Sequence, residues 1–597
     1  MRTDFHSFHI PVMGLAFTID SPIKVAQFGI ASVISIVEDR LIEMMREHYY
    51  RKLNEVYHPI DTHVPDYRAK RITDYLNLVN RIVSLQMDQL KLSAFKAGSD
   101  ICRYFEMLPT KSPLRELYLK MTRCADEKEK LYLQSILRKK MSAGSIDVNI
   151  MTKLDGNASG NKGVPEQDGS DALAALRGFA MSDLTHASIV FSAGLNPRLY
   201  NYLEKFTDFD ATAWGAFRKK VVIKVSDYRS ALIQGKYLAK KGIWVSEFRI
   251  ESGLNCGGHA FATDGFLMGP ILEEFKMKRQ ELVQSLHEIY QPAVKAKGKI
   301  SFEKPHPIRI TAQGGIGTAA ENDFLLNEYA LDATGWGTPF LLCPEATTVD
   351  EPTLERLQNA RKPDLMLSHF SPLGVRYHYL KGTSSDEERL RRIAGGKPGS
   401  PCTEKHLAFN TEFTKEPICT ASKKYQLLKS EQLRSLGLPP EELEKQMEEV
   451  HGKECLCVGL SNSASHLYNV PFLKKLKSVT ICPGPNIAYF DKIVSLKEMT
   501  DHIYGRTNLL EGVDRPHMFV NELALYLGFL KEQTVAAGSD DKKVAYCQKF
   551  ADNLQEGIAY YKTTSIAAED PSFLPALESA ELSIQETLAG LMPEVLV

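Results

Sequence analysis

The stretch KKVVIKVSDYRSALIQGKYLAKKGIWVSEFRI, residues 219–250, combines two kinds of hydrophobic pattern. The short apolar runs VVIKV and IWVSEFRI enclose a segment in which apolar residues recur at helical spacing, with charges between them. Short, nearly continuous apolar runs joined by a helix are typical of parallel strands that are buried on both faces. The stretch therefore predicts a strand–helix–strand unit.

The same alternation recurs along the chain, with interruptions. Apolar runs that resemble strands begin six further segments: IPVMGLAFTI, IASVISIV, SIDVNIMTKL, HASIVFSAGL, PIRITAQGG and ATGWGTPFLL. Together with the two runs above they make eight, and most are separated by stretches able to form a helix, which predicts an α/β fold of the (β/α)8 TIM-barrel class. An open doubly wound sheet is the competing architecture. It requires a Gly-rich dinucleotide turn after the first strand, which PVMGLAFTIDSP lacks.

Two long segments do not follow this alternation. Residues 40–143 carry apolar residues at helical spacing among many charges, which predicts a helical insertion after the second strand. After about residue 350 helical patterns continue without regular strands. The predicted organisation is barrel strands one and two in 1–39, the insertion in 40–143, the rest of the barrel with its site in 144–350, and a mixed, mainly helical extension packed on the barrel in 351–597.

Composition argues against several classes of function. With 43% hydrophobic and 25% charged residues, the chain resembles a soluble globular protein, and its net charge of -1 gives no footprint for nucleic acid or an anionic membrane. No apolar run approaches the roughly 20 residues of a membrane span. The N-terminal sequence lacks the apolar region of a secretory signal, and ten cysteines in 597 residues are too few for a disulfide scaffold. We therefore expect a cytoplasmic protein that acts on a small molecule.

Glycines gather where the last two barrel strands are predicted to end. Active sites of TIM barrels lie at the C-terminal ends of the strands, and a phosphate site commonly follows strands seven and eight. Backbone N–H groups without side chains in the way, near a helix N-terminus, bind phosphate. The predicted phosphate loops contain Gly314, Gly315, Gly317, Gly335, Gly337 and Thr338.

Polar side chains follow three other strands. Asn149 lies on the third strand, Lys224 ends the fifth, and His259 follows the sixth in ESGLNCGGHAFATDG, residues 251–265. Each has a plain alternative: a satisfied amide, a lysine that reaches solvent, and a histidine in a tight turn. Taken together with the phosphate loops, they predict a phosphorylated planar cofactor with a histidine over its reactive face.

These motifs resemble those of the FMN-dependent TIM-barrel enzymes of the nitronate monooxygenase (2-nitropropane dioxygenase) group and of the related FMN-dependent enoyl reductases. The segment from Gly253 to His259 is similar to the family's histidine motif, and Gly314-Gly315-Ile316 and Ala333 to Phe340 are similar to its phosphate strands. The resemblance covers about 9–37 and 144–342. It implies FMN as cofactor, His259 as the catalytic residue, and contacts to FMN from Phe17, Asn149, Lys224, Gly257, Gly258 and the phosphate loops.

The chain departs from that family at two positions. Asn255 stands where a glutamate is usual, and Phe17 stands where a methionine is usual. The resemblance implies a nitronate monooxygenase-like oxidoreductase that oxidises a small carbon acid such as an alkyl nitronate, with His259 as acid or base and O2 as co-substrate. An enoyl reductase that uses NAD(P)H is the alternative. A barrel that binds a phosphorylated metabolite without redox chemistry, or a scaffold for a protein partner, is the second alternative.

Five cysteines lie in the C-terminal extension. Four thiolates can hold a zinc ion or an iron–sulfur cluster. The extension has one Cys-x-Cys pair and no Cys-x2-Cys pair, so the local spacing is poor, and buried free cysteines often pack as small apolar residues. The sequence favours packing and predicts no metal site, while both interpretations stay open for Cys402, Cys419, Cys455, Cys457 and Cys482.

Overall fold

A computed structural model describes residues 5–151, 168–192, 194–258, 263–470, 476–538 and 540–590. Eight parallel strands close into a barrel in the order β1-β10-β9-β8-β7-β4-β3-β2. The predicted α/β TIM-barrel fold is therefore confirmed. The strands are β1 (Phe8–Ile10), β2 (Ala31–Ser35), β3 (Ile146–Ile150), β4 (Ala187–Phe191), β7 (Lys219–Val225), β8 (Val245–Glu251), β9 (Arg309–Gln313) and β10 (Ala333–Gly335). A two-stranded pair, β5 (Ala211–Ala213) with β6 (Ala216–Phe217), precedes β7.

The barrel interior contains an apolar group and a charged group. Val33, Val190 and Val222 lie on strands that are not all neighbours, yet they form one cluster separate from the main core, so they meet across the interior. On β8, alternate residues share a face. Glu247 Oε1 accepts hydrogen bonds from Arg249 at 2.8 and 3.0 Å. Both side chains are buried, so the interior holds an ion pair among its apolar side chains.

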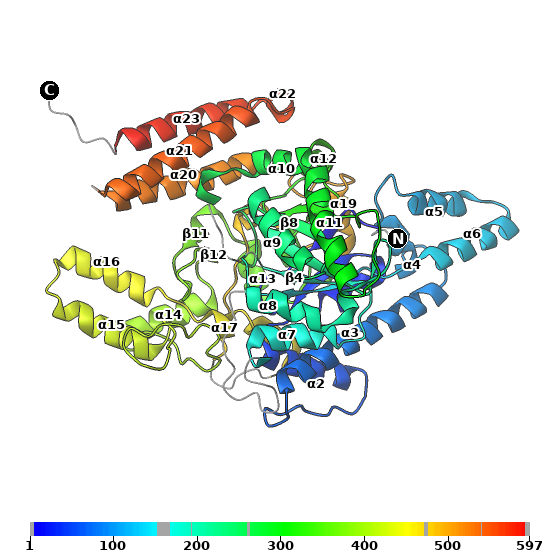
Figure 1. Ribbon diagram of the computed structural model, residues 1–597, viewed down its shortest axis with the longest axis horizontal. Coiled ribbons are helices and arrows are strands. Elements are labelled where there is room, and N and C mark those ends of the chain that lie inside the picture. Colours follow the sequence, from blue (N-terminus) through cyan, green and yellow to red (C-terminus); the bar gives the residue numbers. More distant parts are fainter. Residues whose placement is uncertain are drawn as a thin grey trace.

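Helices cover the outside of the barrel (Figure 1). Side-chain caps fix the N-termini of several, because Asp, Ser, Thr and Asn satisfy backbone N–H groups that a helix leaves unpaired. Asp227 accepts from Ser230 N at the start of the helix predicted between β7 and β8. The helices outside the barrel are α1 (Ser21–Val25), α7 (Asp171–Ala180), α8 (Pro197–Tyr202), α9 (Tyr228–Lys240), α10 (Met268–Met277), α11 (Arg279–Ala296) and α12 (Ala319–Glu328).

The insertion after β2 is helical, as predicted. It contains α2 (Asp39–Lys52), α3 (Tyr67–Leu92), α4 (Asp100–Glu106), α5 (Pro113–Arg123) and α6 (Glu127–Lys140). The long helix α3 packs against α2 and α7, so this part of the insertion joins the outer helix layer of the barrel. Helices α5 and α6 pack on each other and project from the body (Figure 1).

The C-terminal extension is mixed and mainly helical, as predicted. An antiparallel pair, β11 (Leu365–Ser368) with β12 (Tyr377–Leu380), is its only described sheet. Helices α20, α21 and α23 pack together as a layer, and α15 and α16 form a separate pair (Figure 1). Its helices are α13 (Glu351–Gln358), α14 (Ser384–Ala394), α15 (Lys423–Ser435), α16 (Pro440–His451), α17 (Leu456–Gly459), α18 (Asn462–Tyr468), α19 (Leu496–Ile503), α20 (Met518–Ala537), α21 (Asp541–Tyr561), α22 (Ile566–Glu569) and α23 (Phe573–Ala589).

The extension contacts the C-terminal end of the barrel through buried polar side chains. Glu522 of α20 accepts from Ser252 Oγ at 3.0 Å and from Met268 N at 2.9 Å, so one carboxylate joins the loop after β8 to the start of α10. His378 Nε2 lies 2.9 Å from the carbonyl oxygen of Gly253. These contacts place the extension over the end of the barrel where the site is predicted.

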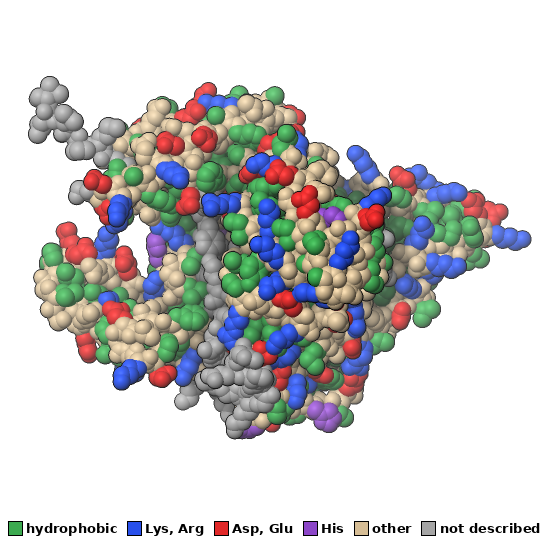
Figure 2. Space-filling model, viewed as in Figure 1, with side chains coloured by type: hydrophobic (Ala, Val, Ile, Leu, Met, Phe, Trp, Pro, Cys, Tyr) green, Lys and Arg blue, Asp and Glu red, His purple; other side chains and the backbone are tan. Residues whose placement is uncertain are grey.

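The surface carries charges of both signs. Figure 2 shows basic and acidic side chains interspersed over the face in view, with no large area of one sign. This agrees with the nearly neutral net charge of -1. Among the described helices, none combines the length and apolarity that a bilayer span requires.

Candidate functional site

A polar network lies at the C-terminal ends of β7, β8 and β9. Glu251 Oε1 accepts three hydrogen bonds: from Lys224 Nζ at 3.0 Å, from Gln313 Nε2 at 2.9 Å and from Asn255 Nδ2 at 2.7 Å. The structure therefore pairs the predicted Lys224 with a carboxylate that the sequence interpretation did not single out. Strand register explains the meeting, because Glu251 faces Gln313 on the neighbouring strand.

Asn149 lies across the barrel mouth on β3. Its side chain is buried, and its Oδ1 atom has no hydrogen-bond partner among the described residues. Buried polar atoms without a partner are uncommon in proteins and call for a bound group or water. The predicted site residue Asn149 thus offers an amide oxygen that a ligand or a water could satisfy.

The two predicted phosphate loops leave neighbouring strands. Gly335 faces Gln313 in the β9–β10 register, so the loops begin side by side. Within the described ranges, four backbone N–H groups on these loops donate to no acceptor: those of Gly315, Ile316, Gly337 and Thr338. All but Gly337 belong to buried residues. Unpaired buried N–H groups are rare, and several close together are a usual anion-binding arrangement.

The other predicted glycines of this region have different surroundings. The Gly317 N–H donates to Glu321 Oε2 at 2.8 Å, so it is not available to a ligand in this conformation. A Cβ atom at Gly314 would lie 3.1 Å from Asn255, and one at Gly335 would lie 2.7 Å from Gln313 Cβ. Gly314 and Gly335 therefore allow close packing at the barrel end.

A segment of the extension, residues 482–486, lies against both loops. Pro483 O accepts from Thr338 Oγ1 at 2.6 Å, which occupies the hydroxyl of that predicted residue. Asn486 Nδ2 donates to the carbonyl oxygens of Gly315 at 2.8 Å and Ile316 at 3.0 Å. The segment bonds to carbonyl and hydroxyl groups of the loops and leaves the four N–H groups unpaired.

Arg515 and Glu321 form a buried ion pair beside the same loops. Arg515 Nη1 lies 2.7 Å from Glu321 Oε1, and Arg515 Nη2 donates to Gly315 O at 2.6 Å. Burial raises the pKa of Glu321, but Arg515, His517 and hydrogen bonds outweigh it and lower the pKa below its ordinary value. The guanidinium places positive charge next to the unpaired N–H groups.

Gly257 and Gly258 are glycines for different reasons. Gly257 has φ of +74°, and a Cβ there would lie 2.3 Å from Met13 Cα, so glycine is required by contact with the loop after β1. Among the described residues, a Cβ at Gly258 would meet only Asn255 Nδ2, at 3.9 Å. Only Gly258 therefore has room for a ligand next to its Cα atom.

Phe17, predicted to contact FMN, and Met13 have different surroundings. Phe17 is fully buried in the main core, and its carbonyl oxygen accepts from Thr348 N at 2.9 Å. Met13 Sδ lies 3.5 Å from the Cβ position of Gly337. Met13, not Phe17, is therefore the side chain of the first loop that reaches the phosphate loops. Met13 lies three residues beyond Ile10, the last residue of β1, and therefore in the loop that follows this strand.

An apolar cavity of about 80 Å³ opens beside Gly258. Residues of the barrel loops form one side, and residues of the extension close the other. Its lining consists of Leu15, Val37, Met151, Gly257, Gly258, Leu373, Tyr377, His406, Leu407, Leu456, Cys457, Leu460 and Cys482. The predicted catalytic residue His259 follows this lining directly in sequence and lies outside the described residues.

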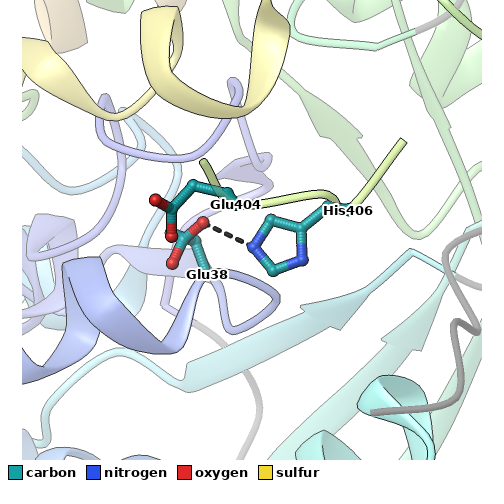
Figure 3. Close-up of side chains that lie close together, drawn as sticks. All are labelled: Glu38, Glu404 and His406. Atoms are coloured by element: carbon teal, nitrogen blue, oxygen red, sulfur yellow. Dashed lines mark hydrogen bonds and ion pairs between the residues drawn. The ribbon is translucent and has the colours of Figure 1, made fainter. Parts of the chain in front are cut away.

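Three side chains from two segments meet after β2: Glu38 from one, and Glu404 and His406 from the other, with ligand-type atoms that all lie within 4.8 Å of one another (Figure 3). His406 Nε2 is 2.6 Å from Glu38 Oε2. Burial lowers the pKa of His406, but Glu38 and Asp171 outweigh it and raise the pKa to about 10. The ion pair of His406 with Glu38 joins residues 404–406 to the barrel.

The described residues fit FMN at both of its ends. The unpaired N–H groups of the two loops, with Arg515 nearby, suit a phosphate. The Lys224 ammonium and the unpaired Asn149 Oδ1 suit the polar edge of a flavin ring. Gly258 lines the apolar cavity.

Comparison with known proteins adds little. No protein-family model and no curated protein matches the chain. Among solved structures, the enoyl reductase domain of MlnA from the macrolactin biosynthesis cluster of Bacillus amyloliquefaciens is similar, at 12% identity and a TM-score of 0.33. The match covers 77% of this chain and 93% of that one. At this TM-score the likeness supports no conclusion, and the fold rests on the strand order described above.

Proposed function

We propose that this protein is an FMN-dependent oxidoreductase with its active site at the C-terminal end of the barrel. The observation that carries the proposal is the group of four unpaired backbone N–H groups on the loops after β9 and β10. Leaving one such group buried and unpaired costs about 1–3 kcal/mol, and three of the four belong to buried residues, which favours a bound anion at this place. The sequence motifs of these loops support FMN phosphate as that anion.

The residues of the mouth would hold and orient the cofactor. FMN, when bound, supplies the redox chemistry. Lys224 provides positive charge near the ring position, and Glu251 fixes the direction of its ammonium group. Asn255 and Gln313 bond to the same carboxylate, so the network is held before any ligand arrives. Such preorganisation lowers the cost of binding.

His259 would exchange a proton with the substrate. The preceding residues Gly257 and Gly258 line the apolar cavity, and His259 follows them directly in sequence. The ordinary pKa of histidine, near 6.5, allows it to take up and release protons at neutral pH. A positioned acid or base of this kind typically contributes about 10²–10⁴ in rate.

The cavity favours a small substrate with an aliphatic part. Its volume of about 80 Å³ and its lining of leucine, valine and methionine side chains exclude a bulky charged molecule. An alkyl nitronate, oxidised at the carbon that bears the nitro group with O2 as electron acceptor, agrees with this. An enoyl group reduced with NAD(P)H fits the same surroundings, so the assay needs both substrates.

Binding of FMN and riboflavin to the full chain tests the phosphate site without any mutation. We expect FMN to bind at least on the order of 100-fold more tightly, since two charge-assisted hydrogen bonds of about 1.5 kcal/mol each give that ratio. Isothermal titration of flavin-free protein measures both affinities. Equal affinities, or no binding of either flavin, would contradict the proposal.

Matched lysine variants test the ring end. Lys224 and Lys220 lie on the same strand, but Lys220 lies near its other end, beside Trp214 and Phe217. We expect Lys224→Met to weaken FMN binding about 10-fold or more, and Lys220→Met to leave it unchanged. Equal effects would show that the site lies elsewhere.

The histidine variant separates catalysis from binding. His259→Ala should retain bound FMN and lose about 10²–10⁴ in turnover of nitronate or enoyl substrate. Loss of FMN with activity restored by excess FMN would show that His259 holds the cofactor and is not the proton donor.

A further inference from the structure

Glu38, Glu404 and His406 form a compact group of side chains of the types that bind metal ions. One ligand-type atom of each lies within 4.8 Å of the other two, and Figure 3 shows the side chains directed toward one another. Glu38 Oε1 accepts from Arg40 N at 3.0 Å at the start of α2, and its Oε2 faces His406. Glu38 follows β2, so the group lies at the end of the barrel where active sites form.

The three side chains are almost completely removed from solvent. Their exposed fractions are 2% for Glu38, 6% for Glu404 and 8% for His406. Two carboxylates this close repel each other, and more strongly away from water. His406 Nε2 is 2.6 Å from Glu38 Oε2, and Arg40 Nη1 is 2.9 Å from Glu404 Oε1. Each of these cations pairs with one carboxylate, whereas a metal ion between the carboxylates would bind both.

Glu404 and His406 come from one loop of the extension. Residues 395–422, between α14 and α15, contain no helix or named strand. Lys405, between the two side chains, has φ of +59°, a left-handed conformation that residues other than glycine seldom adopt. The chain turns at this residue, and both neighbouring side chains face Glu38 (Figure 3). Two ligands thus come from one tight turn and the third from the barrel.

Asp171, the first residue of α7, faces the other ring nitrogen of His406. Its Oδ2 atom is 3.7 Å from His406 Nδ1, and its Oδ1 atom is 3.3 Å from Arg68 Nη2. Metal-binding histidines almost always direct their second nitrogen to a carboxylate, a carbonyl group or water, which orients the ring. His406 therefore has an orienting carboxylate on one side and the two glutamates on the other.

The apolar cavity of about 80 Å³ begins at this group. His406 lines it, and so do Val37 and Leu407, which are next in sequence to Glu38 and His406. Catalytic metal sites typically have three protein ligands and one position left for water or substrate. The cavity supplies the space for that fourth position.

We infer that Glu38, Glu404 and His406 bind a divalent transition metal ion. Bonds of about 2.0–2.2 Å to nitrogen and oxygen place neighbouring ligand atoms about 2.8–3.6 Å apart. The observed atoms, 2.6 Å apart in one pair and within 4.8 Å in all, reach these separations by small side-chain movements. The ion takes the place of the proton between His406 Nε2 and Glu38, and that proton goes to solvent.

The ion would have two effects. It would fasten the loop 395–422 to the barrel, because its ligands come from both. Its fourth position would bind an oxygen atom of the substrate and withdraw electron density from it. This second effect rests on the proposed function, whereas binding of the ion does not. Metal without flavin would contradict only the function, and flavin without metal would contradict only this inference.

The test is metal analysis of the full chain, followed by removal of metal with a chelator and calorimetric titration with Zn²⁺. We expect about one ion per chain and a dissociation constant of about 1 μM or less. Titration with Mn²⁺ should give the same stoichiometry with weaker binding. Manganese prefers oxygen and nitrogen ligands to thiolates, so this second titration excludes binding at cysteines.

Matched variants connect the ion to these residues. Glu404→Gln should weaken Zn²⁺ binding at least about 100-fold, and Asp171→Asn about 10–100-fold, since it removes only the orienting carboxylate. Glu412→Gln is the control, because Glu412 lies in the same loop and pairs with Lys429 at 2.8 Å. It should bind Zn²⁺ like wild type. Circular dichroism checks that each variant is folded.

Three results would overturn the inference. The first is a full chain that holds no metal and binds none on titration, which would leave only the ion pair of His406 with Glu38. The second is equal Zn²⁺ affinity in wild type and Glu404→Gln. The third is Zn²⁺ binding without Mn²⁺ binding, which would place the ion on cysteines.

Discussion

The barrel and the loop 395–422 of the extension keep their shapes by different means. In the barrel every strand pairs with two neighbours, so the ladder closes on itself and leaves no free edge. In the loop, two isolated β-bridges, Ser400 with Ser422 and Asn410 with Ile418, take the place of a ladder of hydrogen bonds between strands. The charged core of the barrel, Glu247 with Arg249, comes from one strand, whereas the loop contacts the barrel through residues far apart in sequence, His406 and Glu38.

This difference between the barrel and the extension indicates how each contributes residues to the candidate site. A closed ladder fixes strand ends to within a residue, so polar groups on neighbouring strands meet by register, as Glu251 and Gln313 do. The extension then supplies groups that no strand could place, such as Arg515 beside Gly315. If this view is right, damage inside the barrel should cost the most stability and damage on the surface of the extension the least.

The largest effect is expected from Glu247→Gln. The change leaves the Arg249 guanidinium buried without its charged partner, and breaking a buried ion pair costs about 3–5 kcal/mol. Burial alone would raise the pKa of Glu247, but Arg249, Arg309 and His9 lower it to about 2 from an ordinary value of 4.5. The stabilisation is therefore complete above about pH 4.5 and is lost as the pH falls toward 2.

Denaturant unfolding of wild type and Glu247→Gln between pH 7 and pH 3 checks this. The difference in free energy of unfolding should narrow below about pH 4.5. A difference that is small at pH 7, or that does not change with pH, would show that the barrel does not depend on this pair.

An intermediate effect is expected from Arg515→Ala, at the joint between the extension and the barrel. Glu321 loses its buried partner but keeps hydrogen bonds from Gly317, Thr318 and Met518 N–H groups. We therefore expect a loss of about 2–3 kcal/mol, less than for Glu247. Limited proteolysis should also cut the extension faster. Unchanged proteolysis would mean that Arg515 does not fasten the extension.

The smallest effect is expected from Lys562→Ala, on the surface of the extension. Its Nζ atom lies 2.8 Å from Glu581 Oε1, with both side chains about one-third exposed. Pairs of this kind contribute about 0–1 kcal/mol. A thermal melt should shift by no more than about two degrees. A shift as large as that of Arg515→Ala would remove the contrast between the two kinds of contact.

The local pattern of hydrophobic residues predicted most of the barrel strands. Seven of the eight strands lie within the expected segments to within two residues, because period and apolar content act over five to ten residues, whereas β1 (Phe8–Ile10) lies before the expected segment 10–19 and shares only Ile10 with it. The first and last strands are shorter than expected, since Pro11 and the glycines from 335 onward end their ladders. In place of a continuing strand, residues 338–342 form a 3-10 helix.

The site was predictable only in part. Asn149 and Lys224 could be proposed because they lie at strand ends, and Gly315 and Gly337 because loop glycines follow strands seven and eight. Glu251 was missed because its partners Lys224 and Gln313 come from neighbouring strands. The contacts of Pro483, Asn486 and Arg515 depend on pairings across more than 100 residues, which spacing in one sequence does not reveal.

The contact of residues 482–486 with the phosphate loops has a consequence for synthesis of the chain. The barrel is complete near residue 350, and the 136 residues from 351 to 486 follow it from the ribosome. At about 5–20 residues per second this takes roughly 7–27 s. Ribosome-bound chains stalled near residue 400 should therefore bind FMN faster than the finished protein, and equal rates would argue against an open interval. A cofactor bound during this interval would later be covered by residues that the ribosome had not yet synthesised when the cofactor bound.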